Sequence, residues 1–198
     1  MKENAEKKWE MLEKETLYSG YFDYLKISSR YQRYDNKWSK KIEREIFERG
    51  DAVSILLYDP KEDSVVMVEQ FRSGAIRHPK GPWTLEIVAG TLEDDESPEE
   101  CIVREVQEEA GITLNNPLLK ISDYLLSPGG STERMWLFFS ETNSADAEGS
   151  FGLEDSGENT KVVVLKRKDA MKMVEDGEIF VASAILSLYW LENKLKNE

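Results

Sequence analysis

Three glutamates in one short segment are the residues of this sequence best arranged to do chemistry. Glu105, Glu108 and Glu109 stand at positions i, i+3 and i+4. In an α-helix these spacings place the three side chains on one face, across an arc of roughly 100°. Like charges so placed repel each other and weaken the helix. Divalent cations between the carboxylates would offset this repulsion, although an acidic face exposed to water also explains a glutamate triplet taken alone.

The residues around the triplet predict the helix that positions it. Ser97, Pro98 and Glu100 are typical of an N-cap, a proline in the first turn and the N3 glutamate of a capping box. Gly111 is placed to end the helix in a left-handed turn. The apolar residues that we expect to pack on a sheet are Ile102, Val103, Val106 and Ala110.

A longer pattern surrounds the triplet: Gly90, five residues, Glu96, seven residues, and then Arg104-Glu-Val-x-Glu-Glu-x-Gly-Ile112. This pattern resembles the Nudix signature at every fixed position, so the chain is similar to Nudix hydrolases. Further segments resemble the bacterial ADP-ribose pyrophosphatase branch of that family. These segments are residues 45–50, 69–72, 82–90, 127–134 and 177–190.

The resemblance implies an α/β fold, the Nudix α/β/α sandwich with a mixed sheet, preceded by a small N-terminal β subdomain. We expect the subdomain at residues 1–50 and the hydrolase domain at residues 51–198. Alternating aromatic and polar residues predict two or three strands between residues 16 and 47, after a charged, frayed helix within residues 1–14. Further strands are predicted at residues 52–58, 65–71, 83–88, 118–126, 135–142 and 162–165, and further helices at residues 168–176 and 182–195.

The same resemblance implies a site for Mg²⁺, with Mn²⁺ as an alternative. Its expected ligands are the carbonyl of Ala89 and the side chains of Glu105, Glu108, Glu109 and Glu158. We expect Arg104 to pair with Glu86 or another nearby carboxylate and so to fix the helix.

The water-activating base is expected in the acidic loop at residues 152–161. Relatives usually carry two glutamates there, one residue apart, and Ser156 stands where the first would be. Either Glu158 takes both roles, or the loop shifts so that Glu154 or Asp155 reaches the water. The expected catalytic residues are therefore Glu108, Glu154 and Glu158.

Substrate contacts are likewise implied by the resemblance. Tyr21 would stack on the base, and Arg44 would reach the phosphates from the second subunit of a homodimer in which the N-terminal subdomains are exchanged. Arg72 would contact the diphosphate, and Gly90 and Ser127 complete the expected set. Alternatively, Tyr21 packs on its own sheet and Arg44 forms a cross-strand ion pair.

Composition limits the partners. The 26 basic and 39 acidic residues give a net charge of −13, which argues against non-specific nucleic-acid binding. One cysteine allows no internal disulfide, and no segment has the apolar length of a membrane span. We therefore expect a cytoplasmic protein with no nucleic-acid or membrane partner.

Three functions remain open from the sequence. The first is hydrolysis of ADP-ribose to AMP and ribose 5-phosphate. The second is hydrolysis of another nucleoside diphosphate sugar, such as GDP-mannose. The third is a Nudix-like module that binds ADP-ribose without cutting it, although the complete pattern of carboxylates argues against it.

Overall fold

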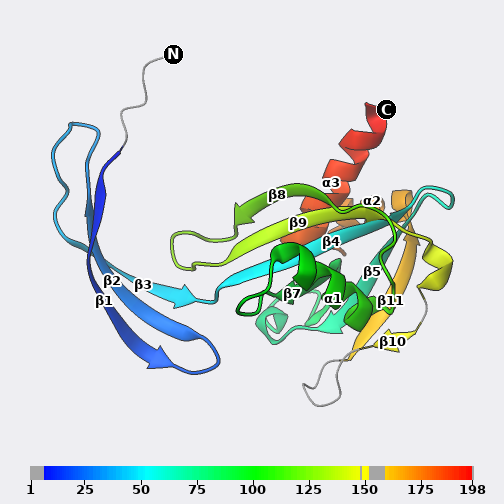
Figure 1. The fold of residues 1–198 in the computed structure, drawn as a ribbon, viewed down its shortest axis with the longest axis horizontal. Coiled ribbons are helices and arrows are strands. Elements are labelled where there is room, and N and C mark those ends of the chain that lie inside the picture. Colours follow the sequence, from blue (N-terminus) through cyan, green and yellow to red (C-terminus); the bar gives the residue numbers. More distant parts are fainter. Residues whose placement is uncertain (1–6, 148, 152–158, 198) are drawn as a thin grey trace. The chain divides into compact units, whose positions relative to one another are not determined.

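The computed structural model describes residues 7–147, 149–151 and 159–197 (Figure 1). The chain divides into two compact units. The first comprises Met1–Asp51 and Leu125–Arg134, and the second comprises Ala52–Tyr124 and Met135–Glu198. The domain boundary expected from the sequence, between residues 50 and 51, remains a proposal.

The first unit contains an antiparallel sheet of β1 (Trp9–Ser19), β2 (Asp23–Tyr31) and β3 (Ile42–Glu48). The expectation of a helix before residue 15 is wrong for residues 9–14, because these residues pair with β2. Their charges are satisfied across the sheet, as when Arg30 pairs with Glu10 at 2.7 Å. Cross-strand pairs of this kind allow a charged segment to be a strand.

The segment 125–134 joins this first unit through the backbone of β3. The amide of Phe47 donates to the carbonyl of Gly130 at 2.9 Å, and the amide of Thr132 donates to the carbonyl of Phe47 at 3.1 Å. The carbonyl of Ser127 accepts from the amides of Gly130 and Ser131, and these two bonds close a tight turn at residues 127–131.

The second unit is built on a mixed sheet in the order β10-β11-β5-β4-β9-β8, with β6 paired to β5 and β7 paired to β4. Its strands are β4 (Asp51–Asp59), β5 (Ser64–Phe71), β6 (Trp83–Glu86), β7 (Val88–Thr91), β8 (Leu119–Leu125), β9 (Arg134–Glu141), β10 (Ser150–Phe151) and β11 (Thr160–Lys166). The single strand expected at residues 83–88 is divided at Ile87. Glu86 pairs with Val68 of β5, whereas Val88 pairs with Ile55 of β4.

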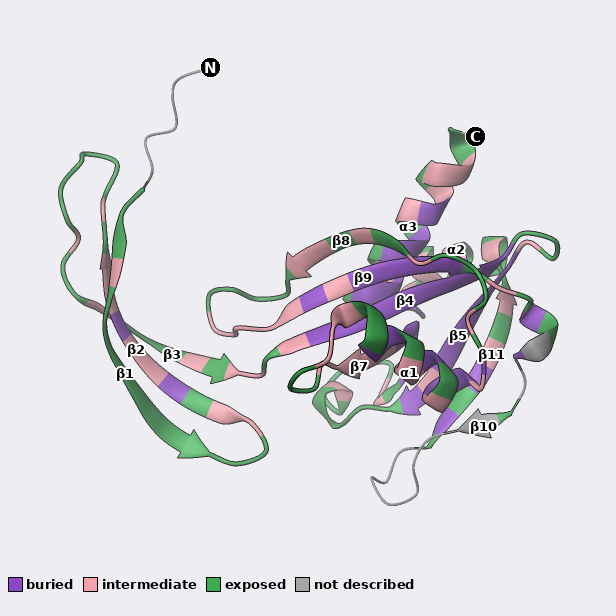
Figure 2. Ribbon diagram, in the orientation of Figure 1, coloured by how far each residue is buried: buried purple, intermediate pink, exposed green. Residues whose placement is uncertain are grey.

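Helices cover both faces of this sheet. The helix α1 (Pro98–Ala110) packs on one face, over a core that includes Val53, Val66 and Val106. The helices α2 (Arg167–Glu175) and α3 (Ala182–Lys196) pack on the other face, over a second core. Figure 2 shows the buried residues concentrated in β4, β5 and β9 between these layers. Short 3₁₀ helices lie at Ser73–Ala75 (η1) and Ser144–Asp146 (η2).

The expected α/β/α arrangement is therefore confirmed. Among the described residues, no helix combines the length and apolar character that a membrane crossing requires.

Candidate active site

The helix that carries the glutamate triplet begins and ends as the sequence predicts. Ser97 is the N-cap, and its hydroxyl accepts from the amide of Glu100 at 3.2 Å while the Glu100 carboxylate accepts from the amide of Ser97 at 2.9 Å. Gly111 ends the helix with a φ of 65°. One expectation is wrong: Val103 is 46% exposed. It stands at the border of the packed arc, whose interior is taken by Cys101, Ile102, Val106, Glu109 and Ala110.

Glu109 is a buried carboxylate, which the sequence did not anticipate. At 100° per residue it lies only about 20° from Ile102, so it points at the sheet with the apolar residues. Its side chain accepts from the amide of Ala89 at 3.2 Å, and the residue is 7% exposed. Burial raises the pKa of Glu109 to about 8, and the nearby carboxylates of Glu105 and Glu86 add to the rise.

Gly90 gives Glu105 its position. A Cβ atom added to Gly90 would lie 2.0 Å from both Cδ and Oε1 of Glu105, closer than real Cβ contacts come. The Glu105 carboxylate therefore lies directly against the backbone of β7, one residue from the Ala89 amide that contacts Glu109. Glycine is the residue that allows this approach, because it lacks a side chain.

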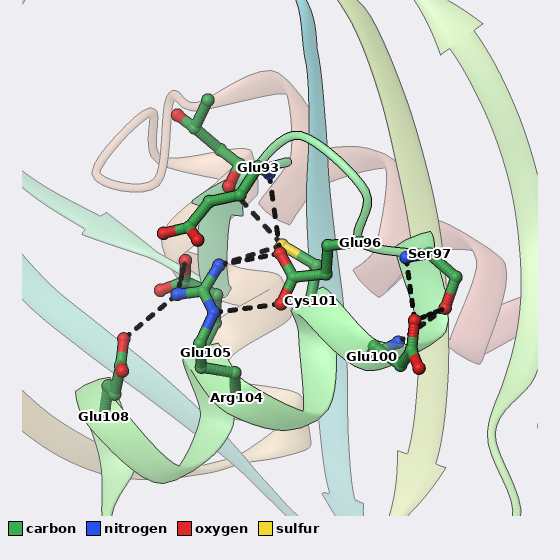
Figure 3. Close-up of polar contacts among 9 residues, drawn as sticks. Glu93, Glu96, Ser97, Glu100, Cys101, Arg104, Glu105 and Glu108 are labelled. Atoms are coloured by element: carbon green, nitrogen blue, oxygen red, sulfur yellow. Dashed lines mark hydrogen bonds and ion pairs between the residues drawn. The ribbon is translucent and has the colours of Figure 1, made fainter.

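Arg104 holds the remaining carboxylates together (Figure 3). Its Nε and Nη2 donate to the two oxygens of Glu96, both at 3.0 Å. Its Nη1 donates to Glu105 at 2.8 Å and to Glu108 at 3.1 Å. The hydrogen bonds from Arg104 lower the pKa of Glu96 to about 2. Arg104 thus fixes the helix, as expected, but its partners are these three glutamates and not Glu86.

The partner of Glu86 is Arg72, which the sequence had assigned only to substrate. Arg72 donates from Nε and Nη2 to the two carboxylate oxygens of Glu86, both at 3.0 Å, and the Thr84 hydroxyl donates to the same carboxylate. Glu86 is 5% exposed, so it needs this cation. Alternation along β6 places Thr84 and Glu86 on one buried face, but no local pattern indicates Arg72 as the partner of Glu86. The side chain of Arg72 remains 43% exposed beside Glu86.

The donor set of the triplet fits a hard divalent cation. Among the described residues, no three His, Cys, Asp or Glu side chains already stand as a metal-binding group. Arg104 instead provides the positive charge between Glu105 and Glu108. However, carboxylates beside a backbone carbonyl are the oxygen donors that Mg²⁺ prefers. Burial raises the pKa of Glu109, so a cation beside this carboxylate would stabilise its ionised form. Glu105, Glu108, Glu109 and the carbonyl of Ala89 would hold the ion.

Cys101 shows no sign of a chemical role. It is fully buried beside Arg104, and its thiol lies 3.5 Å from the carbonyl of Thr91. Burial raises the pKa of this thiol to about 12, which makes it inert as a nucleophile.

The expected substrate contacts of the N-terminal strands lie in the first unit. Tyr21 is 90% exposed and its ring contacts Phe22 edge-on at 4.6 Å. It borders a pocket of about 520 Å³ lined by Tyr18, Tyr21, Phe22, Asp23, Tyr24 and Phe47. The alternative that Tyr21 packs into its own sheet is at odds with this exposure.

Arg44 is also exposed, on β3, and donates to the carbonyl of Glu43 at 2.7 Å. The carboxylate of Glu43 instead pairs with Lys26 and Lys41. The assignments of Tyr21, Arg44 and Ser127 to substrate remain predictions, as does that of Arg72. Glu154, Ser156 and Glu158 lie outside the described residues.

Comparison with known proteins agrees with this geometry. The model of the NUDIX domain matches residues 48–183, more than half of the chain. The chain therefore belongs to the Nudix family and is a hydrolase that acts on pyrophosphate bonds.

Its relatives indicate a particular branch of the family. The chain is 41% identical to an ADP-ribose pyrophosphatase of Haemophilus influenzae over 188 residues, which cover 92% of this chain and 85% of that protein. It is 39% identical to an ADP-ribose pyrophosphatase of Escherichia coli (strain K12), covering 96% and 91% of the two chains. A GDP-mannose pyrophosphatase of Pectobacterium atrosepticum is 38% identical, over 73% of this chain and 74% of that protein.

A solved structure described as an ADP compounds hydrolase has the same fold. The superposition gives a TM-score of 0.71 and covers 96% of this chain and 95% of the other, at 20% sequence identity.

Proposed function

We propose that this protein hydrolyses the diphosphate bond of ADP-ribose, with Mg²⁺, to yield AMP and ribose 5-phosphate. One water is consumed, and its oxygen joins one of the two phosphorus atoms. The observation that carries the proposal is the set of α1 carboxylates against the Ala89–Gly90 backbone, within a chain whose relatives at about 40% identity are named ADP-ribose pyrophosphatases.

The residues of α1 supply the negative charge that such a reaction requires. Glu105 and Glu109 are held against β7 and would be direct ligands, and Glu108 would bind directly or through one water. Mg²⁺ bound there would neutralise the diphosphate and lower the pKa of water. Because Arg104 bonds Glu96, Glu105 and Glu108, it keeps the carboxylates in place before any ion arrives.

Arg72 is the side chain that we assign to the diphosphate. Glu86 fixes its guanidinium through two hydrogen bonds, and Thr84 in turn donates to Glu86, so little conformational freedom is left to lose on binding. The exposed part of the side chain would meet phosphate oxygens, for which arginine geometry is well suited. Its charge would also offset the local acidity of a protein with a net charge of −13.

The aromatic pocket beside Tyr21 supports base stacking in the first unit. An exposed tyrosine at a pocket with four further aromatic neighbours offers a flat apolar surface to a purine. Arg44 and Ser127 would contribute polar contacts. We further propose that the protein is a homodimer that exchanges its N-terminal subdomains. The cytoplasmic location and the absence of nucleic-acid and membrane partners stay predictions from composition.

The general base is assigned from the sequence alone. Glu158 is the first candidate and Glu154 the second, because Ser156 cannot accept the proton without help. Glu158 would also bind metal.

A second candidate function is hydrolysis of GDP-mannose. It is favoured by the relative of that name, which shares 38% identity over 147 residues. Because this relative matches a smaller share of the chain, hydrolysis of GDP-mannose ranks after hydrolysis of ADP-ribose.

A substrate panel tests the proposal. The protein is incubated with ADP-ribose, ADP-glucose, GDP-mannose and a diadenosine polyphosphate, with Mg²⁺ or with a chelator, in ¹⁸O-labelled water. We expect the highest kcat/KM for ADP-ribose and loss of turnover with the chelator or in Glu109→Gln. Preferred cleavage of GDP-mannose would select the second candidate, and activity that survives in Glu109→Gln would refute the site.

A further inference from the structure

The loop between β5 and β6 is exposed and yet well organised. Arg72 begins it and Pro82 ends it, and the Arg72 amide donates to the Pro82 carbonyl at 2.8 Å. Between them every residue from Ser73 to Lys80 is exposed except Ala75, which is intermediate. The loop therefore has almost no contact with the hydrophobic core, and its conformation must be maintained in another way.

A chain of three turns runs through the loop from Arg72. The amide of Ala75 donates to the Arg72 carbonyl at 2.9 Å, the amide of His78 donates to Ala75 at 2.8 Å, and the amide of Gly81 donates to His78 at 2.9 Å. Each bond joins residues three apart, so the backbone of His78 is linked to that of Arg72 through a single intermediate residue. These turn hydrogen bonds therefore connect the backbone of His78 to that of Arg72.

Two contacts fasten this loop to the segment between α2 and α3. The ring of His78 stacks on that of Phe180, with centroids 3.9 Å apart and planes 17° from parallel. Lys80, two residues after His78, forms an ion pair with Glu178, two residues before Phe180. We name these two contacts, made by His78, Lys80, Glu178 and Phe180, the loop clasp. Its halves are about a hundred residues apart in the sequence, but both belong to the second unit.

We propose that the loop clasp positions Arg72 for binding the diphosphate. The inference rests on the proposed function, in which Arg72 contacts that group. One end of the loop is Arg72, and the other leads into β6, which carries Glu86, the partner of Arg72, and Thr84, which donates to Glu86. The clasp thus maintains the hairpin from which the Arg72–Glu86 pair projects. Its four members are positioning residues, and they do not touch substrate.

Trypsin provides a direct readout of the clasp. The bonds after Arg77 and Lys80 are tryptic sites inside the exposed loop. Because a stacked ring pair contributes roughly 0.5–1.5 kcal/mol, its loss should increase opening, and therefore cleavage after Arg77, about 2- to 12-fold. We expect this increase in His78→Ala and in Phe180→Ala, measured by mass spectrometry on the folded protein. We expect His78→Phe, which keeps the stack, to be cleaved at the wild-type rate.

Kinetics tests the effect on Arg72. A binding contact present in both the ground state and the transition state affects KM and leaves kcat unchanged. We therefore expect His78→Ala and Phe180→Ala to raise KM for ADP-ribose about 2- to 12-fold, with kcat within about 2-fold of wild type. His78→Phe should restore KM.

Charge reversal tests the ion pair separately. Lys80→Glu and Glu178→Lys should each raise KM, and the double variant should recover it, since the pair is then rebuilt with opposite polarity. Lys168→Glu is the matched control: it makes the same charge change on an exposed residue of α2 outside the clasp.

The outcomes separate this proposal from the function on which it rests. If the wild-type protein hydrolyses ADP-ribose but His78→Ala and Phe180→Ala keep wild-type KM, the clasp has no positioning role. The same conclusion follows if cleavage by trypsin rises while KM does not. If wild-type protein fails to hydrolyse any nucleoside diphosphate sugar, the proposed function is wrong, while the tryptic comparison still decides whether the clasp holds the loop.

Discussion

Replacing Gly90 by alanine should disable the metal site without touching a carboxylate. The new Cβ would lie 2.0 Å from Cδ and Oε1 of Glu105, whereas ordinary contacts begin at 3.4 Å. The Glu105 carboxylate must therefore retreat by more than about 1 Å, well outside the tolerance of Mg²⁺–oxygen bonds of about 2.0–2.1 Å. Misplacement of a catalytic group by about 1 Å can cost about 10²-fold in rate. We expect kcat/KM to fall by about that factor.

The assay is ADP-ribose turnover over a Mg²⁺ titration, with circular dichroism to show that the fold is retained. Gly74→Ala is the matched control, because nothing lies within 4 Å of a Cβ at that position and its φ is not positive. Gly90→Ala turnover and Mg²⁺ dependence equal to those of the control would refute the reasoning. Either Glu105 would then act from another position, or it would not bind the ion.

Three further predictions concern the base, the pH dependence and the assembly. Glu158→Gln should reduce kcat more than Glu154→Gln does, and equal or reversed losses would move the base to another residue. Since the pKa of buried Glu109 is raised to about 8, its neutral form stabilises the metal-free fold below the unfolded pKa near 4.5, and this contribution is lost as pH rises through 8. Mg²⁺ binds the ionised form of Glu109, so the increase in Tm on adding Mg²⁺ should be larger at pH 8.5 than at pH 6.5. The Glu109→Gln variant should show no such difference between the two pH values. Equal increases in Tm in the wild-type protein would contradict the assignment of Glu109 as a ligand. Light scattering at micromolar concentration should give the mass of a dimer, and a monomer would exclude a site shared between exchanged subdomains.

Local signals in the sequence predicted the site helix well. The capping box at Ser97 and Glu100 and the left-handed Gly111 depend on neighbours a few residues away, and all three stand as expected. The strand at residues 9–14 was missed because its charges are satisfied by β2, and a charged segment without such a partner would not form a strand. The secondary structure of residues 9–14 depends on their pairing with β2, which no local sequence pattern reveals.

Contacts between segments distant in the sequence also limited how much of the site could be predicted. The sequence assigned Arg72 to the substrate but could not show that Glu86, fourteen residues later, holds its guanidinium. It placed Glu109 with Glu105 and Glu108 on one carboxylate face of the helix, whereas the structure buries Glu109 on the packed arc against Ala89. The contact of His78 with Phe180 joins segments about a hundred residues apart, and no motif in the sequence connects them.

A crystal structure with Mg²⁺ and a non-hydrolysable methylene analogue of ADP-ribose would test the central claim most directly. The account predicts an ion at about 2.0–2.1 Å from carboxylate oxygens of Glu105 and Glu109, with the analogue's diphosphate against it. A bound analogue with no ion beside these two glutamates would contradict it.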